Sequence, residues 1–424
     1  MNKAELWQPA LVILTVALAI SLRFFTKLRG YQFTAWIVAA VTAAMIYPDA
    51  FKHWGTLDLR NKWLILVVVQ AVMFGMGTQM SLHDFAGIVK TPRGVFVGIV
   101  CHFSVMPLVG FALTKIFHFE AEIAAGIILI GSCSSGLASN VMAYIAKSNL
   151  VLSVTVTAIT TMIAPIMTPF WMKMLANQLV PVSYMNMMVE IVKIVLVPIG
   201  AALLHDYLKT AGFRGRNVVL IMAAIGVAWL TFLMLGGWDF LKTHFPDTKI
   251  DDKVQPNYAL TAISLGGFLL SAFIIGTVYH WLTRWFTKLD SWMPVLSMAG
   301  IVYFTTVTTA AGRDNLLKIG GVLFLAAVIH NAAGYFFGYW LSRASGLDKN
   351  SARSVAFEVG LQNGGMASGL AGGMGKLATV GLAAAIFSPW MNVSGSVLAN
   401  YWRKRPVEEK PEASVQEQEQ VSRL

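Results

Sequence analysis

Apolar runs of about twenty residues recur along almost the whole chain and limit its fold more than any other feature. A run of this length can cross the hydrocarbon of a bilayer as a helix. The runs are continuous and lack the period-two alternation of barrel strands, so we expect an all-α polytopic membrane protein. Thirteen runs are predicted, near residues 9–25, 32–48, 63–80, 94–115, 123–146, 150–172, 183–204, 217–237, 258–282, 291–311, 319–342, 354–373 and 377–400.

The composition agrees with this fold class. Of the 424 residues, 56% are hydrophobic and 12% are charged, which leaves too little polar surface for a soluble domain. The formal net charge of +11 could indicate nucleic-acid binding. However, the cations lie at the ends of the apolar runs, and no basic patch interleaved with aromatic residues is present. We therefore expect a lipid bilayer, and no nucleic acid, among the partners.

The short loops between the runs predict the orientation in the membrane. Cytoplasmic loops are enriched in Lys and Arg, and every second loop has this character. Its cations are Arg23, Lys27, Arg29, Lys90, Arg93, Lys147, Lys209, Arg214, Arg216, Arg284, Lys288, Arg343, Lys349, Arg353, Arg403, Lys404 and Arg405. The acidic residues Asp239, Asp247, Asp251 and Asp252 lie in a loop of the other set. This predicts a bacterial inner membrane protein with its N-terminus outside and a disordered cytoplasmic tail at 403–424.

Two runs are interrupted by glycines and small polar residues. One lies within 131–165 and begins GSCSSGLASN, and the other is SVAFEVGLQNGGMASGLA at 354–371. Each follows a run with an internal histidine, His102 or His330. A break is costly in lipid unless it lines a site, and paired broken helices in corresponding halves are typical of transporters built from inverted repeats. A binding site is expected where the breaks meet.

Oxygen-bearing side chains near these breaks suit a small cation. Glu358 places a carboxylate inside an apolar run, which costs several kcal/mol and marks a functional position. Ser153 and Thr157 are four residues apart, so one helix face presents two hydroxyls. Hard cations such as sodium prefer oxygen ligands. A half-helix that begins at a break also favours an anion, and Asn140 and Asn363 lie near those beginnings.

Several motifs occur in a recognisable order: MFGMG at 73–77 with Asp84 and Phe85, HFSVMP, GLASNVMAYIA with LSVTVT, FEVGLQNGGMA, and WMNVSGS at 390–396. Over about residues 32–402 the chain resembles the bile acid:sodium symporter family. The resemblance implies two inverted five-helix repeats, core and panel domains, and two crossing broken helices. The implied organisation is an extra N-terminal helix with a basic loop at 1–31, a first repeat at 32–182, the start of the second at 183–204, an inserted helical hairpin with an outside loop at 205–290, the remainder at 291–402, and the tail.

The resemblance also implies a secondary transporter that couples sodium to symport of an organic anion by alternating access. The implied first sodium site comprises Ser139, Asn140, Ser153, Thr157 and Glu358. The implied second site comprises Glu358, Gln362, the carbonyls of Val359 and Leu361, and His102 where the family commonly has glutamine. The implied substrate residues are Leu137, Ala138, Asn140, Asn363, Met391 and Asn392.

Departures from the family pattern leave alternatives open. Imidazole is a poorer sodium ligand than an amide oxygen, so His102 suggests proton-coupled or pH-gated transport as an alternative, with one or two sodium ions bound. Leu137 and Met391 make the pocket less polar, so bile acid is not predicted as the substrate. A membrane enzyme or a channel is a remote alternative, since no catalytic or metal motif is present. We expect His330 to be structural, Glu190 and Lys193 to form a local pair, and no catalytic residue.

Overall fold

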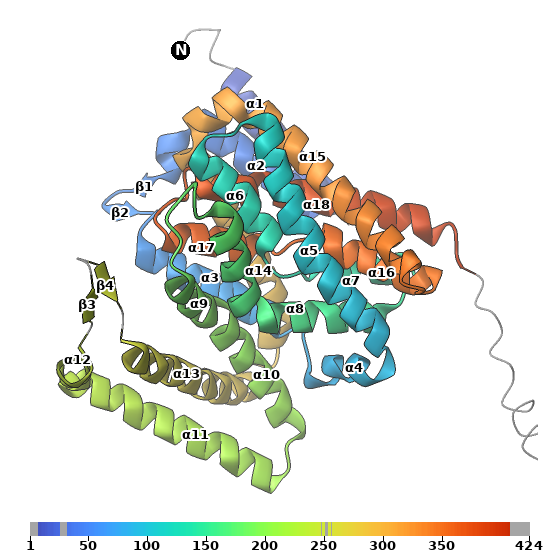
Figure 1. The fold of residues 1–424 in the computed structure, drawn as a ribbon. Helices are drawn as coiled ribbons and strands as arrows, with labels where there is room; N and C mark the ends of the chain where they lie inside the picture. Colours follow the sequence, from blue (N-terminus) through green and yellow to red (C-terminus); the bar gives the residue numbers. More distant parts are fainter. Residues whose placement is uncertain (1–6, 26–31, 247, 251–252, 256, 408–424) are drawn as a thin grey trace, which may run out of the picture.

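The computed structural model describes residues 7–25, 32–246, 248–250, 253–255 and 257–407 (Figure 1). The predicted tail beyond 407 and the loop residues Lys27, Arg29, Asp247, Asp251 and Asp252 lie outside this part of the chain. The expected all-α membrane fold is confirmed. Among the described residues, eight helices are long and apolar enough to cross a membrane, or nine if one bent pair counts as a span.

The first half of the chain forms helices α1 to α8. They are α1 (Trp7–Ser21), α2 (Gln32–Ile46), α3 (Lys62–Gly77), α4 (Gly87–Lys90), α5 (Pro92–Phe117), α6 (Ala121–Ser132), α7 (Ala138–Ile145) and α8 (Leu150–Trp171). The strands β1 (His53–Trp54) and β2 (Leu57–Asp58) form a short antiparallel hairpin between α2 and α3. The run predicted at 63–80 is shorter than expected, because α3 ends at Gly77 and the chain bends before α4.

The second half forms helices α9 to α18. They are α9 (Tyr184–Ile191), α10 (Val197–Thr210), α11 (Phe213–Phe232), α12 (Trp238–His244), α13 (Tyr258–Trp285), α14 (Leu289–Ala311), α15 (Arg313–Ala344), α16 (Lys349–Gly360), α17 (Gly364–Gly373) and α18 (Val380–Arg403). The strands β3 (Thr248–Ile250) and β4 (Lys253–Gln255) pair between α12 and α13. A π-helical turn, Val192–Leu196, joins α9 and α10 into one long helix.

Polar side chains fix where several helices begin. The Asn149 side chain accepts a hydrogen bond from the backbone N–H of Leu152, at 3.1 Å, and so starts α8. Asn363 accepts from the backbone N–H of Met366 at 3.0 Å and starts α17. Such caps satisfy N–H groups that the first turn leaves unpaired. The same kind of cap starts α3, α9, α13 and α16, at Asn61, Ser183, Asn257 and Asp348.

The helices form two groups, which we call the panel and the core. In the panel, α14 packs against α2 and α3, and α10 packs against α3. In the core, α5 packs against α6, α15 and α16, and α18 packs against α6, α15 and α17. The two groups meet where α17 contacts α3 and where α8 contacts α9. This division agrees with the core and panel that the family resemblance implies.

The helices α11 and α13 form a hairpin beside the panel, at the lower edge of Figure 1. The hairpin packs through α13 against α10, and little of its surface is buried within the protein. One anchor is Asp290 at the start of α14, which accepts a hydrogen bond from the Tyr279 hydroxyl at 2.8 Å and pairs with Lys209 at 3.0 Å. The family resemblance implies two repeats of five helices, to which this hairpin and α1 would be additions. This interpretation stays a prediction.

The two predicted breaks lie side by side in the core. The first separates α6 from α7 and the second separates α16 from α17, as expected from the sequence. The backbone N–H of Gly136 donates to the Leu361 carbonyl at 2.8 Å, and the N–H of Asn363 donates to the Ser134 carbonyl at 2.8 Å. These bonds form an antiparallel bridge between the breaks. The breaks therefore satisfy each other's backbone groups, which makes them tolerable inside a membrane.

Candidate cation and substrate site

Glu358 lies in the last turn of the α16 half-helix, directly before the crossover, and is fully buried. The Thr157 hydroxyl donates to its Oε2 at 2.7 Å, and the Ser153 hydroxyl makes a short hydrogen bond to its Oε1. Both hydroxyls come from one face of α8, as their spacing predicts. The structure thus brings the predicted carboxylate and both predicted hydroxyls together.

Asn140 and Ser139, from the first turn of α7, complete this group of oxygens. The Asn140 Oδ1 atom lies 3.0 Å from the Ser153 Oγ and 3.1 Å from the Thr157 Oγ1. The Ser139 Oγ lies 3.2 Å from the Thr157 Oγ1. All five residues of the predicted first sodium site therefore share one buried cluster, which we call the oxygen cluster.

The oxygen cluster has more close oxygen–oxygen contacts than hydroxyl hydrogens to fill them. Ser153 and Thr157 each approach both Asn140 Oδ1 and a Glu358 oxygen, yet a hydroxyl has only one hydrogen to donate. With Glu358 ionised and the Asn140 oxygen facing the hydroxyls, one of these close oxygen contacts at each hydroxyl has no hydrogen between the atoms. Lone pairs that face each other in a buried site repel unless a positive charge lies between them. The donor set fits a hard cation such as sodium, which takes hydroxyl, amide and carboxylate oxygens.

The oxygens of the predicted second site differ in their hydrogen bonding. The Gln362 Nε2 donates to the Val359 carbonyl at 2.7 Å, and the Leu361 carbonyl accepts from Gly136 N–H in the crossover. Each carbonyl oxygen has a second lone pair besides the one that accepts this bond. The Gln362 Oε1 atom, in contrast, is buried and has no hydrogen-bond partner. This orphaned acceptor fits a cation without displacing another bond.

His102 lies between the two breaks and contacts both. Its Nδ1 lies 2.9 Å from the Glu358 carbonyl oxygen, and its Nε2 lies 2.9 Å from the Cys133 carbonyl oxygen. The ring is fully buried. His102 therefore spans the crossover by hydrogen bonds to backbone and does not reach the carboxylate itself.

The predicted substrate residues gather around the crossover with different partners. Asn363 caps α17, and its Nδ2 lies 3.5 Å from the Ser134 hydroxyl. The Met391 sulfur accepts from the Gln362 N–H at 3.2 Å. Leu137 and Ala138 are half-buried at the start of α7. Asn392 lies one residue beyond Met391 and donates within α18, to the Ser388 carbonyl at 3.0 Å.

Sequence reasoning missed several polar groups that hold the second break. The Asn331 Nδ2 donates to the Gly360 carbonyl at 2.8 Å, and the Asn331 Oδ1 accepts from the Ser394 hydroxyl. The Tyr335 hydroxyl lies 3.2 Å from the Ser394 Oγ. The motif HNAAGY contains Asn331 and WMNVSGS contains Ser394, so the signal was present. Only the tertiary structure shows that these motifs face the end of α16.

Two minor expectations agree with the structure. The His330 Nε2 lies 3.0 Å from the Met106 carbonyl oxygen in the buried core, consistent with a structural histidine. Glu190 and Lys193 form the expected pair, with 3.3 Å between Oε1 and Nζ.

Comparison with known proteins identifies the family. A model of the Sodium Bile acid symporter family matches residues 65–244. An uncharacterized sodium-dependent transporter, YocS of Bacillus subtilis, is 29% identical over 388 residues, which cover 91% of this chain and 94% of YocS. The chain belongs to the sodium bile acid symporter family. It is therefore a secondary transporter of a sodium-dependent family, with a bilayer and a small-molecule substrate as its partners.

Other relatives of this protein are named for different solutes. A probable sodium/metabolite cotransporter of Arabidopsis thaliana chloroplasts, BASS1, is 27% identical over 88% of this chain and 73% of that protein. The human ileal sodium/bile acid cotransporter is 25% identical over 76% of this chain and 72% of that protein. The relatives agree on sodium and differ in the solute that their names give.

A solved structure supports the fold alone. The sodium proton antiporter MjNhaP1 of Methanocaldococcus jannaschii superposes with a TM-score of 0.52 over 95% of this symporter and 99% of that chain. The sequences are 13% identical, so the likeness concerns the arrangement of helices and carries no information about the transported ions.

Proposed function

We propose that this protein couples inward movement of sodium to uptake of a small organic anion by alternating access, with the core moving against the panel. The observation that carries the proposal is the hydrogen-poor oxygen cluster around Glu358. Its oxygens come from α7, α8 and α16, so a bound cation draws together three helices that meet at the crossover. We further propose that the protein lies in the cell membrane with its N-terminus outside, as its basic loops indicate.

The choice of an anion is supported by the half-helix that begins at the crossover. α17 starts at Asn363 with its first N–H groups directed toward the break, and its dipole favours negative charge there. Asn363 and Gly136 lie within the same bridge, close to the oxygen cluster. Because a sodium ion beside Glu358 would offset that residue's charge, an anion could bind nearby without facing an uncompensated carboxylate. Cation and anion should then raise each other's affinity.

Thr157→Val tests the oxygen cluster with a change of nearly equal volume. The variant removes one oxygen ligand and should raise the half-saturating sodium concentration by about tenfold or more, equivalent to about 1.4 kcal/mol. Uptake of labelled substrate, or stabilisation of the purified protein, measured across a sodium titration gives the value. The matched control is Thr161→Val on the same helix. The Thr161 hydroxyl donates to the Thr157 carbonyl at 2.8 Å and lies outside the cluster. Equal sodium affinity in both variants would contradict the assignment.

A second candidate function is transport coupled to a proton at the position of the second cation. The observation that favours it is the pair of carbonyl oxygens, one 2.9 Å from each ring nitrogen of His102. Both carbonyls can only accept, and only a doubly protonated imidazole donates from both nitrogens. A proton on His102 would then place one positive charge where the family has a second cation.

His102→Gln distinguishes the two candidates. If the proton is coupled, wild-type transport at fixed sodium should change between about pH 5.5 and 8, the range in which histidine changes charge. The variant should then be flat over this range. Uptake into proteoliposomes at several pH values, with the sodium gradient held constant, is the measurement. Identical profiles for the two proteins would remove His102 from the mechanism and leave sodium as the sole coupling ion.

A further inference from the structure

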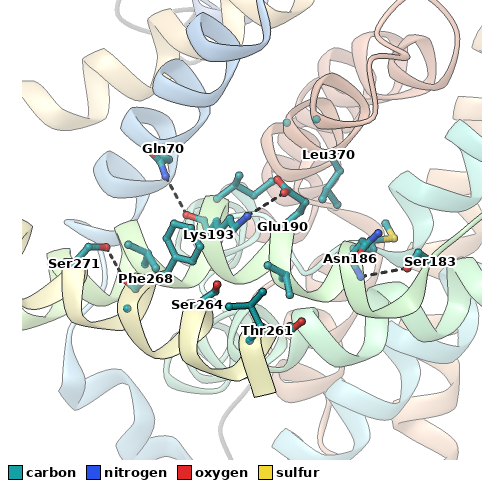
Figure 2. Close-up of a pocket in the computed structure, with 18 of the residues that line it drawn as sticks. Gln70, Ser183, Asn186, Glu190, Lys193, Thr261, Ser264, Phe268, Ser271 and Leu370 are labelled. Carbon is teal, nitrogen blue, oxygen red and sulfur yellow. Dashed lines mark hydrogen bonds and ion pairs between the residues drawn. The ribbon is translucent and has the colours of Figure 1, made fainter. Parts of the chain in front are cut away.

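A pocket of about 940 Å³ lies between the panel, the end of α17 and the hairpin of α11 and α13, and Glu358 is not among its lining residues. We call it the outer pocket. It lies where α9 and α13 begin and α17 ends, which the basic loops predict to be the outer side of the membrane. Its lining includes Gln70, Glu190, Lys193, Trp229, Phe268 and Leu370 (Figure 2).

Lys193 is the main charged group of the outer pocket. Its Nζ lies 3.3 Å from the Glu190 Oε1 and 4.7 Å from the centre of the Phe268 ring. Figure 2 shows the lysine between these two side chains. The residue is nine positions after Tyr184, the first residue of α9, so it lies roughly 13 Å along the helix. Ionisable groups within membrane-spanning helices are costly and usually functional.

The backbone around Lys193 is also irregular. The π-helical turn Val192–Leu196 includes this residue, and π-helical turns inside helices occur frequently at functional sites. Gln70 of α3 donates from its Nε2 to the Lys193 carbonyl at 3.2 Å. This bond ties the irregular turn to a neighbouring panel helix. The backbone that carries the lysine is thus held in place from outside its own helix.

The hairpin supplies one wall of the pocket. Thr261, Ser264, Phe268 and Ser271 lie on one face of α13 because they recur at intervals of three and four residues, and all four line the pocket. Leu370 of α17 contributes to the lining from the core. Apolar walls with a few polar groups and a volume below about 1,000 Å³ are typical of sites for small organic ligands.

The charges favour an anion. Among the described lining residues, the ionisable ones are two lysines, Lys62 and Lys193, and one glutamate, Glu190. We propose that the outer pocket binds an amphipathic organic anion, whose carboxylate pairs with Lys193 and whose apolar body lies against Phe268 and Leu370. The role of this pocket as an entry site for the transported anion rests on the proposed function. Leu370 belongs to the core, whereas Lys193 and Phe268 do not. An anion that contacts all three therefore stabilises one arrangement of core and panel.

The test is equilibrium binding of radiolabelled naphthylacetate to the full-length protein in nanodiscs of phosphatidylcholine. Lys193→Met should weaken binding about tenfold or more, while Lys193→Arg should largely restore it. Glu190→Gln should strengthen binding, because it removes the carboxylate that competes for the lysine. Naphthylacetamide, which has the same ring and no charge, should bind wild type and Lys193→Met equally. Opposite effects of the two charge changes cannot arise from misfolding alone.

Lys115→Met is the matched control, because the Lys115 Nζ also lies over a phenylalanine ring, 5.2 Å from the centre of Phe111, but outside the pocket. It should bind like wild type. Equal binding by wild type and Lys193→Met would overturn the proposal. Displacement of naphthylacetate by phosphatidylglycerol added to the nanodiscs would instead assign the pocket to acidic lipid headgroups and overturn its role as an entry site.

Sodium-driven uptake, measured in proteoliposomes from the same wild-type preparation, separates this proposal from the proposed function. Absence of such uptake would overturn the proposed function and leave the binding result unchanged.

Discussion

Glu358→Gln should abolish the stabilisation of this symporter by sodium and reduce sodium-driven uptake to background. The substitution keeps the size of the side chain and removes the only charge in the oxygen cluster, so the remaining oxygens have no carboxylate to attract a cation. At a sodium concentration one hundred times its dissociation constant, wild type should gain about 2.7 kcal/mol of stability from binding, and the variant none. Melting temperatures in sodium chloride and potassium chloride at equal ionic strength measure the difference.

Glu120→Gln is the matched control for the loss of a carboxylate. Glu120 is exposed at the start of α6 and lies outside the oxygen cluster, so it should retain the full sodium effect. A sodium-specific rise in melting temperature that survives in Glu358→Gln would contradict the proposed cation site. The same assay, with sodium present, can then be used to search for organic anions that add further stability.

Gly136→Ala should disable transport and lower stability by about 1 to 3 kcal/mol, the usual cost of overpacking. A Cβ atom at this position would lie 2.8 Å from the Gln362 carbonyl oxygen and 3.3 Å from the Gln362 carbonyl carbon. Both are backbone atoms of the opposite break, so a side-chain rotation cannot relieve the contact. The bridge between the two breaks must therefore open or shift. The measurements are the melting temperature in sodium and the rate of uptake.

Gly321→Ala is the control for adding a methyl group to a helix of the core. No heavy atom lies within 4 Å of a Cβ at this position, and alanine favours a helix over glycine by about 1 kcal/mol. The variant should transport normally and be as stable as wild type or more so. Normal uptake by Gly136→Ala would show that the crossover does not depend on the close approach of the two backbones.

The residues of the oxygen cluster could be predicted from the sequence, because some are related by a short spacing along one helix and the others lie in specific motifs. Ser153 and Thr157 lie on the same face of a helix whatever the tertiary structure, because they are four residues apart. Glu358 is a charged residue within an apolar run. The family resemblance supplied the remaining link, that α7, α8 and α16 meet. Composition and run length predicted the membrane class, and the glycines and small polar residues that interrupt two runs predicted the breaks. Both predictions follow from the cost of exposing backbone groups to lipid.

Other features depend on contacts that no short segment reveals. Lys193 was expected to pair with Glu190, which is three residues away, but its contact with Phe268 joins parts of the chain that no local pattern connects. The family resemblance placed His102 in the second cation site, because it stands where the family commonly has glutamine. Its hydrogen bonds to two backbone carbonyls depend on how closely the breaks approach it. The outer pocket likewise exists only because the hairpin packs beside α10.

The bridge between the breaks has a consequence for biosynthesis. Gly136 and Ser134 emerge from the ribosome long before Leu361 and Asn363, which are their backbone partners. Until the later segment arrives, the first break must keep its carbonyl and N–H groups paired with water or with the insertion machinery. The core is thus completed only near the end of translation, and a chain truncated before residue 361 contains helices α1 to α8 without the backbone partners of their break.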